Sequence, residues 1–95
     1  MSETSLLTML KTDLGILSTE RYDERLLNYL TSATEAIRQE GAVSINPLSP
    51  LDAQLIVLYA AWMWRKRDSM EGMPRMLRWQ LNNRVFSEKA GDGNG

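Results

Sequence analysis

The chain has 95 residues, of which 43% are hydrophobic and 24% charged, and its formal net charge is −1. This length and composition predict one globular domain that is small for a stable monomer. Cysteine and histidine are both absent, which excludes a disulfide framework, thiolate chemistry and the commonest general base. The N-terminal residues lack a basic segment leading into an apolar one, so we expect no signal peptide.

The first predicted helix begins between residues 2 and 5 and runs to Leu14. Its leucines recur at helical spacing, at positions 6, 7, 10 and 14. Gly15 follows directly, and glycine takes the left-handed conformation that commonly ends a helix. We therefore expect this helix to stop at Gly15.

The second predicted helix covers residues 20–39. Ser18 and Thr19 supply a hydroxyl cap, and acidic residues in the first turn favour the helix dipole. One apolar stripe then follows the helical period, formed by Tyr22, Leu26, Tyr29, Leu30, Ala33 and Ile37. Gly41 is predicted to end the helix.

Residues 41–50 contain two prolines, which exclude a regular helix. Val43 and Ile45 alternate with polar neighbours, so a short extended piece is expected, with these side chains holding the loop on the core. A third helix is predicted to start after Ser49, which would be its cap, with Pro50 at the first helical position and Asp52 two residues later. It is expected to continue to about Met70 and to stop at Gly72.

The fourth predicted helix opens at Pro74 and covers about residues 74–87. Residues 88–95 are rich in glycine and are expected to form a flexible tail, leaving residues 1–87 as a single helical domain. The predicted fold class is all-α: a small four-helix domain with two long helices, short N- and C-terminal helices and a proline-containing loop.

The third helix contains the most unusual segment of the chain, residues 55–64, which carry neither a charge nor an amide. A helix that is apolar all round must be covered on every side, and this run is too short to cross a bilayer. One interpretation is a central helix surrounded by the other three. The other is that a stripe of Leu51, Leu55, Leu58 and Trp62 builds the core, while the surface around Val57, Ala60 and Trp64 docks another subunit; both can hold together.

Charge is distributed unevenly along the chain. Residues 1–52 carry eight acidic and four basic residues, whereas residues 53–95 carry four acidic and seven basic ones. Such a dipolar chain suits head-to-tail association or an anionic partner. Aromatic residues mixed with arginine are typical of protein interfaces and, less often, of nucleic-acid grooves, although a solvated face without a partner is a third interpretation. The candidate interface residues are Val57, Ala60, Trp64, Arg65, Arg67, Arg75, Arg78, Trp79 and Arg84.

The sequence contains few residues in patterns that are typical of catalytic sites. Glu20, Asp23 and Glu24 cluster, but a helix N-terminus is a sufficient structural reason for them. No glycine-rich phosphate loop follows a strand, and residues 91–95 lack the acidic ligand that should close a calcium loop. We expect no enzyme activity, no catalytic residue, no cofactor and no metal site.

Two blocks of residues resemble the head–tail connector (adaptor or head-completion) proteins of long-tailed double-stranded DNA bacteriophages. The first block is Leu10–Ile16 with Tyr22–Leu30 and Ala33–Ile37, similar to the family's short helix, glycine break and acid-opened long helix. The second is Asp52–Trp62 with Arg65–Arg67 and then Met73–Arg84, similar to the second long helix and the basic C-terminal helix. The 41–50 segment is shorter than the loop of some relatives, so the resemblance assigns it no channel-lining role.

The resemblance implies a structural virion assembly protein, found at the head–tail interface of the virion and in the host cytoplasm during assembly. About a dozen copies would form a homo-oligomeric ring beneath the portal after DNA packaging. Its partners would be the portal protein and a stopper or tail-completion protein, with non-specific contact to packaged DNA left open. Ring number, the particular partners and the oligomeric state before assembly are not determined by the sequence.

Two other classes of protein compete with this interpretation. A small helical DNA-binding regulator would use the basic fourth helix, but the calculated pI of 5.4 lacks the expected basic footprint. A membrane-surface helix over residues 55–67 is disfavoured because its apolar surface is continuous rather than one-sided.

Overall fold

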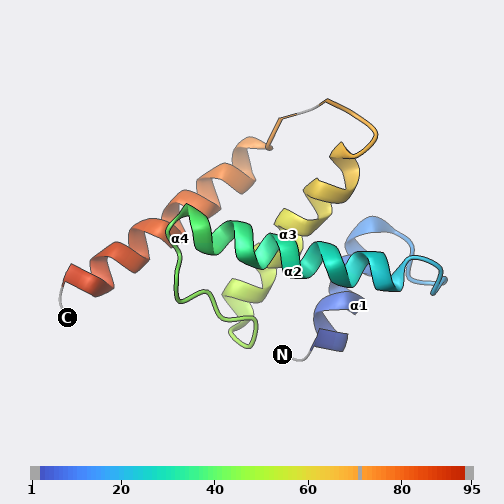
Figure 1. Ribbon diagram of the computed structural model, residues 1–95, viewed down its shortest axis with the longest axis horizontal. Coiled ribbons are helices and arrows are strands. Elements are labelled where there is room, and N and C mark those ends of the chain that lie inside the picture. Colours follow the sequence, from blue (N-terminus) through green and yellow to red (C-terminus); the bar gives the residue numbers. More distant parts are fainter. Residues whose placement is uncertain (1–2, 71, 94–95) are drawn as a thin grey trace.

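The computed structural model describes residues 3–70 and 72–93, and within these ranges the fold is all-α, as the sequence predicts. Four helices occur in the described ranges: α1 (Glu3–Leu14), α2 (Asp23–Glu40), α3 (Pro50–Lys66) and α4 (Arg75–Gly93). Figure 1 shows α2 crossing α3, with α1 beside one end of the pair and α4 on the opposite side of the molecule. The chain forms a flat body of 46 × 31 × 17 Å, to whose long dimension α4 contributes.

Two glycines end helices where the sequence predicts that they should. Gly15 has φ 74° and Gly41 has φ 131°, both in the region that side chains disfavour. After α1, the Gly15 amide donates to the Thr12 carbonyl and the Ile16 amide to the Lys11 carbonyl. This is the Schellman pattern, which satisfies carbonyl groups left over at a helix end. The amides of residues 41 and 42 repeat it after α2.

Helix α2 begins three residues later than predicted. The amide of Asp23 donates to the Glu20 carbonyl across a turn, and the hydroxyl of Thr19 accepts from the Arg21 amide within that turn. The hydroxyl therefore stabilises the turn instead of capping the helix. The apolar stripe of α2 is confirmed: Leu26, Leu30, Ala33 and Ile37 are buried, and Tyr22 and Tyr29 are partly buried against the same core.

Helix α3 ends at Lys66, four residues before the predicted end and well short of Gly72. All residues from Arg65 to Met70 are exposed, so nothing apolar holds a further helical turn on the core. The Ser69 amide instead donates to the Lys66 carbonyl in a turn. The indole of Trp62 donates to the Gly72 carbonyl at 3.2 Å, which holds the returning chain over α3.

Helix α4 begins one residue after Pro74 and runs to Gly93, beyond the predicted end at 87. The predicted end of this helix at residue 87 is therefore wrong, and residues 94–95 of the expected tail lie outside the described residues. The reason is tertiary, because the carboxylate of Glu88 binds both the amide and the hydroxyl of Ser44. In the 41–50 loop, Ile45 is buried as predicted but Val43 is exposed, and no extended strand forms there among the described residues.

The core lies where α1, α2 and α3 meet, and it shows that the predicted orientation of α3 is wrong. Leu51 is 79% exposed, and Leu58 and Trp62 are only partly buried. The buried face of α3 instead includes Ile56, Val57, Ala60, Ala61 and Trp64 together with Leu55. Because the helix is apolar all round, its own pattern does not determine which stripe turns inward; the neighbouring helices do.

Candidate interaction surface

The outer surface of α3 lies between a groove toward α1 and a groove toward α4 and carries an exposed and a partly buried leucine. We name Leu51, Gln54 and Leu58 the α3 face. These residues follow each other at helical spacing, and the first two are exposed while Leu58 is partly buried. Leucine side chains left in water forgo about 1.5–3 kcal/mol each relative to full burial. The α3 face is therefore a surface that gains free energy when another protein covers it.

A groove lies on each side of the α3 face. The groove toward α1 has a volume of about 360 Å³ and is lined by Met9, Gln54, Val57 and Leu58 together with threonines of α1 and Asp13. The groove toward α4 has a volume of about 430 Å³ and is lined by Leu51, Leu55, Trp79 and polar side chains of both helices. Trp79 is 58% exposed at this edge. Partly exposed aromatic and methionine side chains of this kind are enriched at the centres of protein interfaces.

Ionisable groups along both grooves are already paired inside the subunit. Arg84 Nε lies 2.8 Å from Asp52 Oδ1, and the guanidinium of Arg65 lies 3.5 Å from the carboxylate of Asp13. The α3 face is consequently bordered by neutralised pairs, which suits contact with an uncharged protein surface better than contact with a polyanion.

The predicted interface residues separate into three groups. Val57, Ala60 and Trp64 are buried inside the subunit, and Trp64 is only 8% exposed, so the prediction that these three form a docking surface is wrong. Trp64 packs edge-on against Tyr22, the residue directly before α2, and against Tyr29 within α2, with ring centroids 5.3 and 5.8 Å away. Its burial follows from these two tyrosines, which face inward together.

Four of the predicted arginines are engaged within the chain. Arg65 and Arg84 pair with Asp13 and Asp52 as described, and the guanidinium of Arg78 lies 3.3 Å from the Glu40 carboxylate. Arg67 lies over the ring of Trp64 at 3.7 Å. Three of these contacts join a base from the basic half to an acid from the acidic half, so much of the uneven charge distribution is neutralised by folding and less remains for a partner.

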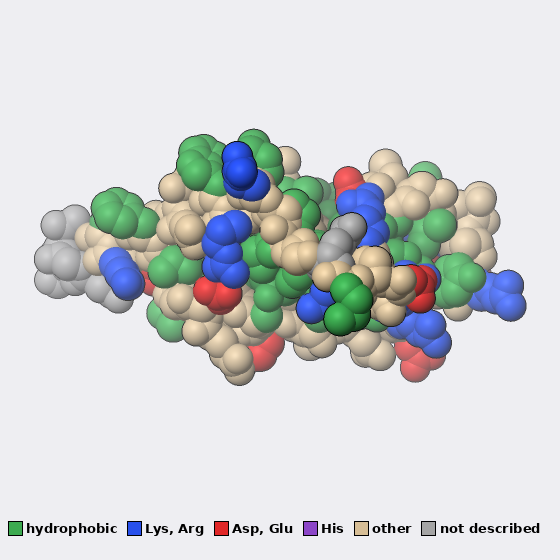
Figure 2. All heavy atoms as spheres, turned by 90° about the horizontal axis from the view of Figure 1, so that it is seen from above, with side chains coloured by type: hydrophobic (Ala, Val, Ile, Leu, Met, Phe, Trp, Pro, Cys, Tyr) green, Lys and Arg blue, Asp and Glu red, His purple; other side chains and the backbone are tan. Residues whose placement is uncertain are grey.

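The remaining two predicted interface residues, Arg75 and Trp79, are exposed. Arg75 forms no ion pair with the described residues. Both lie on α4, whose outward surface also exposes Met76 and Phe86. On the face shown in Figure 2, hydrophobic and basic side chains lie close together at the end of the molecule that α4 forms. Sequence reasoning missed Met76 and Phe86, although Leu77 and Leu81 at helical spacing already mark the opposite, inward side of this helix.

The protonation behaviour of three groups follows from their neighbours. The pKa of Arg84 is raised, chiefly by its hydrogen bond to Asp52. The pKa of Glu88 is lowered, first by the hydroxyl and then by the amide of Ser44. The pKa of Tyr59 is raised by burial and by the nearby Glu40 carboxylate. None of these shifts brings a group toward neutral pH, where a general acid or base has to work.

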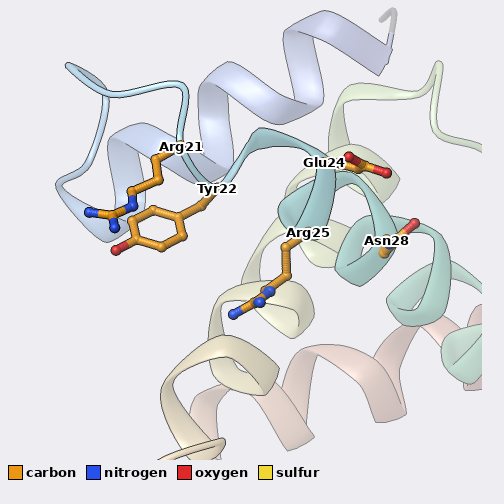
Figure 3. Close-up of a pocket in the computed structure, with 5 residues that line it drawn as sticks. All are labelled: Arg21, Tyr22, Glu24, Arg25 and Asn28. Atoms are coloured by element: carbon orange, nitrogen blue, oxygen red, sulfur yellow. The ribbon is translucent and has the colours of Figure 1, made fainter.

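A polar depression also lies at the start of α2. It has a volume of about 400 Å³ and is lined by Arg21, Tyr22, Glu24, Arg25 and Asn28. Figure 3 shows these five side chains diverging rather than converging on one point. A small-molecule site needs a few polar groups aimed at a common centre within an apolar cavity, so this depression does not qualify. Within residues 3–70 and 72–93, no three acidic side chains come close enough together to hold a metal ion.

Comparisons with known proteins give no assignment: no family model, no curated protein and no solved structure matches this chain. Among the described residues, no helix has the length and apolar character needed to cross a membrane.

Proposed function

We propose that this protein is a non-catalytic assembly subunit, and specifically a head–tail connector (adaptor) that forms a ring beneath a phage portal. The observation that carries the proposal is the α3 face, an apolar ridge with a groove on each side and an exposed tryptophan at one edge. Exposed apolar patches rimmed by polar side chains often mark sites of protein interaction, which supports association.

The helix order supports the connector over other assembly proteins. The elements follow the order that the sequence resemblance implies. They are a short helix, a glycine break, a long helix with acidic residues in its first turn, a second long helix and a basic C-terminal helix. A ring of identical subunits needs two different complementary surfaces on each copy. The α3 face with Trp79 at its edge would supply one, and the outward surface of α4 with Met76 and Phe86 would supply the other.

The DNA-binding alternative gains nothing from the arrangement of α4. Two of its arginines, Arg78 and Arg84, point to acids of the same chain, at 3.3 and 2.8 Å. A recognition helix needs side chains free to reach base edges and phosphates. Only Arg75 and Lys89 remain as exposed bases without a described ion pair on this helix, which is a small electrostatic footprint for a duplex.

The test compares self-association and portal capture for the wild type and two leucine variants. Leu51→Glu places a charge on the α3 face, where the side chain is 79% exposed, and Leu17→Glu is the matched control at another exposed leucine, in the turn before α2. Mass is measured by light scattering as concentration rises, and co-purification uses a portal protein encoded in the same genome. We expect a ring or a concentration-dependent oligomer that Leu51→Glu weakens at least tenfold and Leu17→Glu does not.

Three outcomes would count against the proposal. The wild type could stay monomeric and fail to bind the portal protein, or both leucine variants could behave like the wild type. Duplex DNA binding that falls steeply with salt would instead favour the regulator.

A further inference from the structure

Helix α4 is attached to the rest of the subunit more weakly than any other long helix. Of its described side chains only Leu77 and Leu81 are buried, whereas α3 buries nine residues. In Figure 1 it lies along one side of the molecule, and its C-terminal end extends past the other helices. We name the surface that α4 covers, on α3 and the 42–49 loop, the α4 seat.

Polar contacts supply much of the remaining attachment to the α4 seat. Arg84 donates to the carboxylate of Asp52 at 2.8 and 3.3 Å and to the hydroxyl of Ser44 at 3.2 Å. Glu88 accepts from the same hydroxyl at 2.6 Å, and Arg78 reaches Glu40 at the end of α2. Partly exposed ion pairs weaken as salt screens them, so α4 is the long helix whose attachment responds most readily to its surroundings.

The linker before α4 is long and lightly held. Residues 67–70 are exposed, and the Met70 side chain is as accessible as in an extended chain. In the described part of the linker, the contacts with the body are those of Arg67 with the ring and carbonyl of Trp64, the hydrogen bond from Trp62 to Gly72 and the partly buried Met73. Eight residues, 67–74, can span about 27 Å when extended, so the linker leaves α4 room to leave its own subunit.

We propose that α4 is an exchangeable arm, which in the assembled protein occupies the α4 seat of the next copy. The occupant is known, because the seat fits α4 in this chain, and a second copy offers an identical helix with identical contacts. Exchange therefore conserves the packing of Leu77 and Leu81 and the pair between Arg84 and Asp52. What changes is the path of the linker and the entropy of association.

An arm passed from each copy to the next generates a head-to-tail contact, and a closed series of such contacts is a ring. The inference thus rests on the proposed ring-forming function and specifies how its copies are joined.

Charge-swap complementation tests the exchange. Asp52→Arg disrupts the α4 seat of one chain and Arg84→Asp disrupts the arm of the other, so neither variant can dock its own arm with the native pair. When the two variants are mixed and exchange arms, the native Arg84 of the first chain meets the native Asp52 of the second. We expect a mixed species in native mass spectrometry that associates at least tenfold more tightly than either variant alone.

The matched control uses the ion pair of Asp13 and Arg65, which joins α1 to α3 within the body of the subunit. The variants Asp13→Arg and Arg65→Asp should show no complementation when mixed. A mixture of the Asp52 and Arg84 variants without mixed species, or equal complementation by the control pair, would overturn the exchange of arms.

Linker length gives a second test that leaves the ion pair intact and so does not depend on how the Asp52 variant folds. Deleting Ser69 and Met70, both exposed, should hinder α4 from folding back and lower the concentration at which oligomers form. Inserting Gly-Ser-Gly-Ser after Ser69 should raise it. Equal concentration dependence for the shortened and lengthened chains would refute the proposal. If the wild type still captures the portal protein and forms rings in that case, the connector function stands and only the exchange fails.

Discussion

Replacement of Trp64 by alanine separates the two roles that a tryptophan beside a basic cluster can have. As a docking residue it would matter for association and little for folding. In the structure it is 8% exposed, packs edge-on against Tyr22 and Tyr29, and lies under the guanidinium of Arg67 at 3.7 Å. We therefore expect Trp64→Ala to act on the stability of the single subunit.

The magnitude follows from these contacts. Truncation of a buried tryptophan to alanine costs about 3–5 kcal/mol, and each aromatic pair contributes about 0.5–1.5 kcal/mol, part of which is already in that figure. A domain of this size has a total free energy of unfolding of about 5–15 kcal/mol. We expect a loss of about 4 kcal/mol, which leaves the variant marginally folded at 25 °C.

Urea unfolding followed by circular dichroism measures the effect, at a concentration where the wild type is monomeric. With a slope of about 1–2 kcal/mol per molar urea for a small domain, the midpoint should fall by roughly 2–4 M. Trp79→Ala is the control, since Trp79 is 58% exposed and its loss should change stability by less than about 0.5 kcal/mol. A loss below about 1 kcal/mol for Trp64→Ala, or equal losses for both, would refute the assignment of Trp64 to the core.

Three further predictions concern the contacts between elements. Lys11→Met removes the buried ammonium that lies 2.8 Å from the Asp23 carboxylate. Because that carboxylate is only partly exposed, the free energy of unfolding measured by urea titration should fall by about 1–3 kcal/mol. A neutral result would mean that water replaces the pair. Gly41→Ala places a Cβ 2.9 Å from Cγ1 of Val85 at a φ of 131°, so thermal unfolding should show that the free energy of unfolding falls by about 1–3 kcal/mol. The control Gly72→Ala, whose Cβ meets nothing within 4 Å, should leave the free energy of unfolding nearly unchanged. Because the pKa of Glu88 is lowered in the folded state, its carboxylate stabilises the fold at pH values above its ordinary pKa of 4.5. This contribution is lost as the pH falls through the lower pKa of the folded state, so the difference in melting temperature between the wild type and Glu88→Gln should close below pH 4.5. A difference that stays constant with pH would contradict this prediction.

Much of the fold was predictable from local features. The helix order, the ends at Gly15 and Gly41 and the apolar stripe of α2 follow from residue type and periodicity, which act within a few residues along the chain. The predicted ends of α3 and α4 were wrong because tertiary contacts decide them. The hydrogen bond from Trp62 to Gly72 turns the chain back after Lys66, and Ser44, more than forty residues away, holds the end of α4 through Glu88.

The sequence by itself determined the four helices, the absence of histidine and cysteine, and the presence of one helix too apolar for a free surface. Only the tertiary structure decided which side of that helix is the core. A helix with apolar residues all round has a period but no preferred face, so the positions of α1, α2 and α4 select one. Trp64 therefore turns inward to the two tyrosines that pack against it, and Leu51 turns outward to the surface that we propose another copy covers.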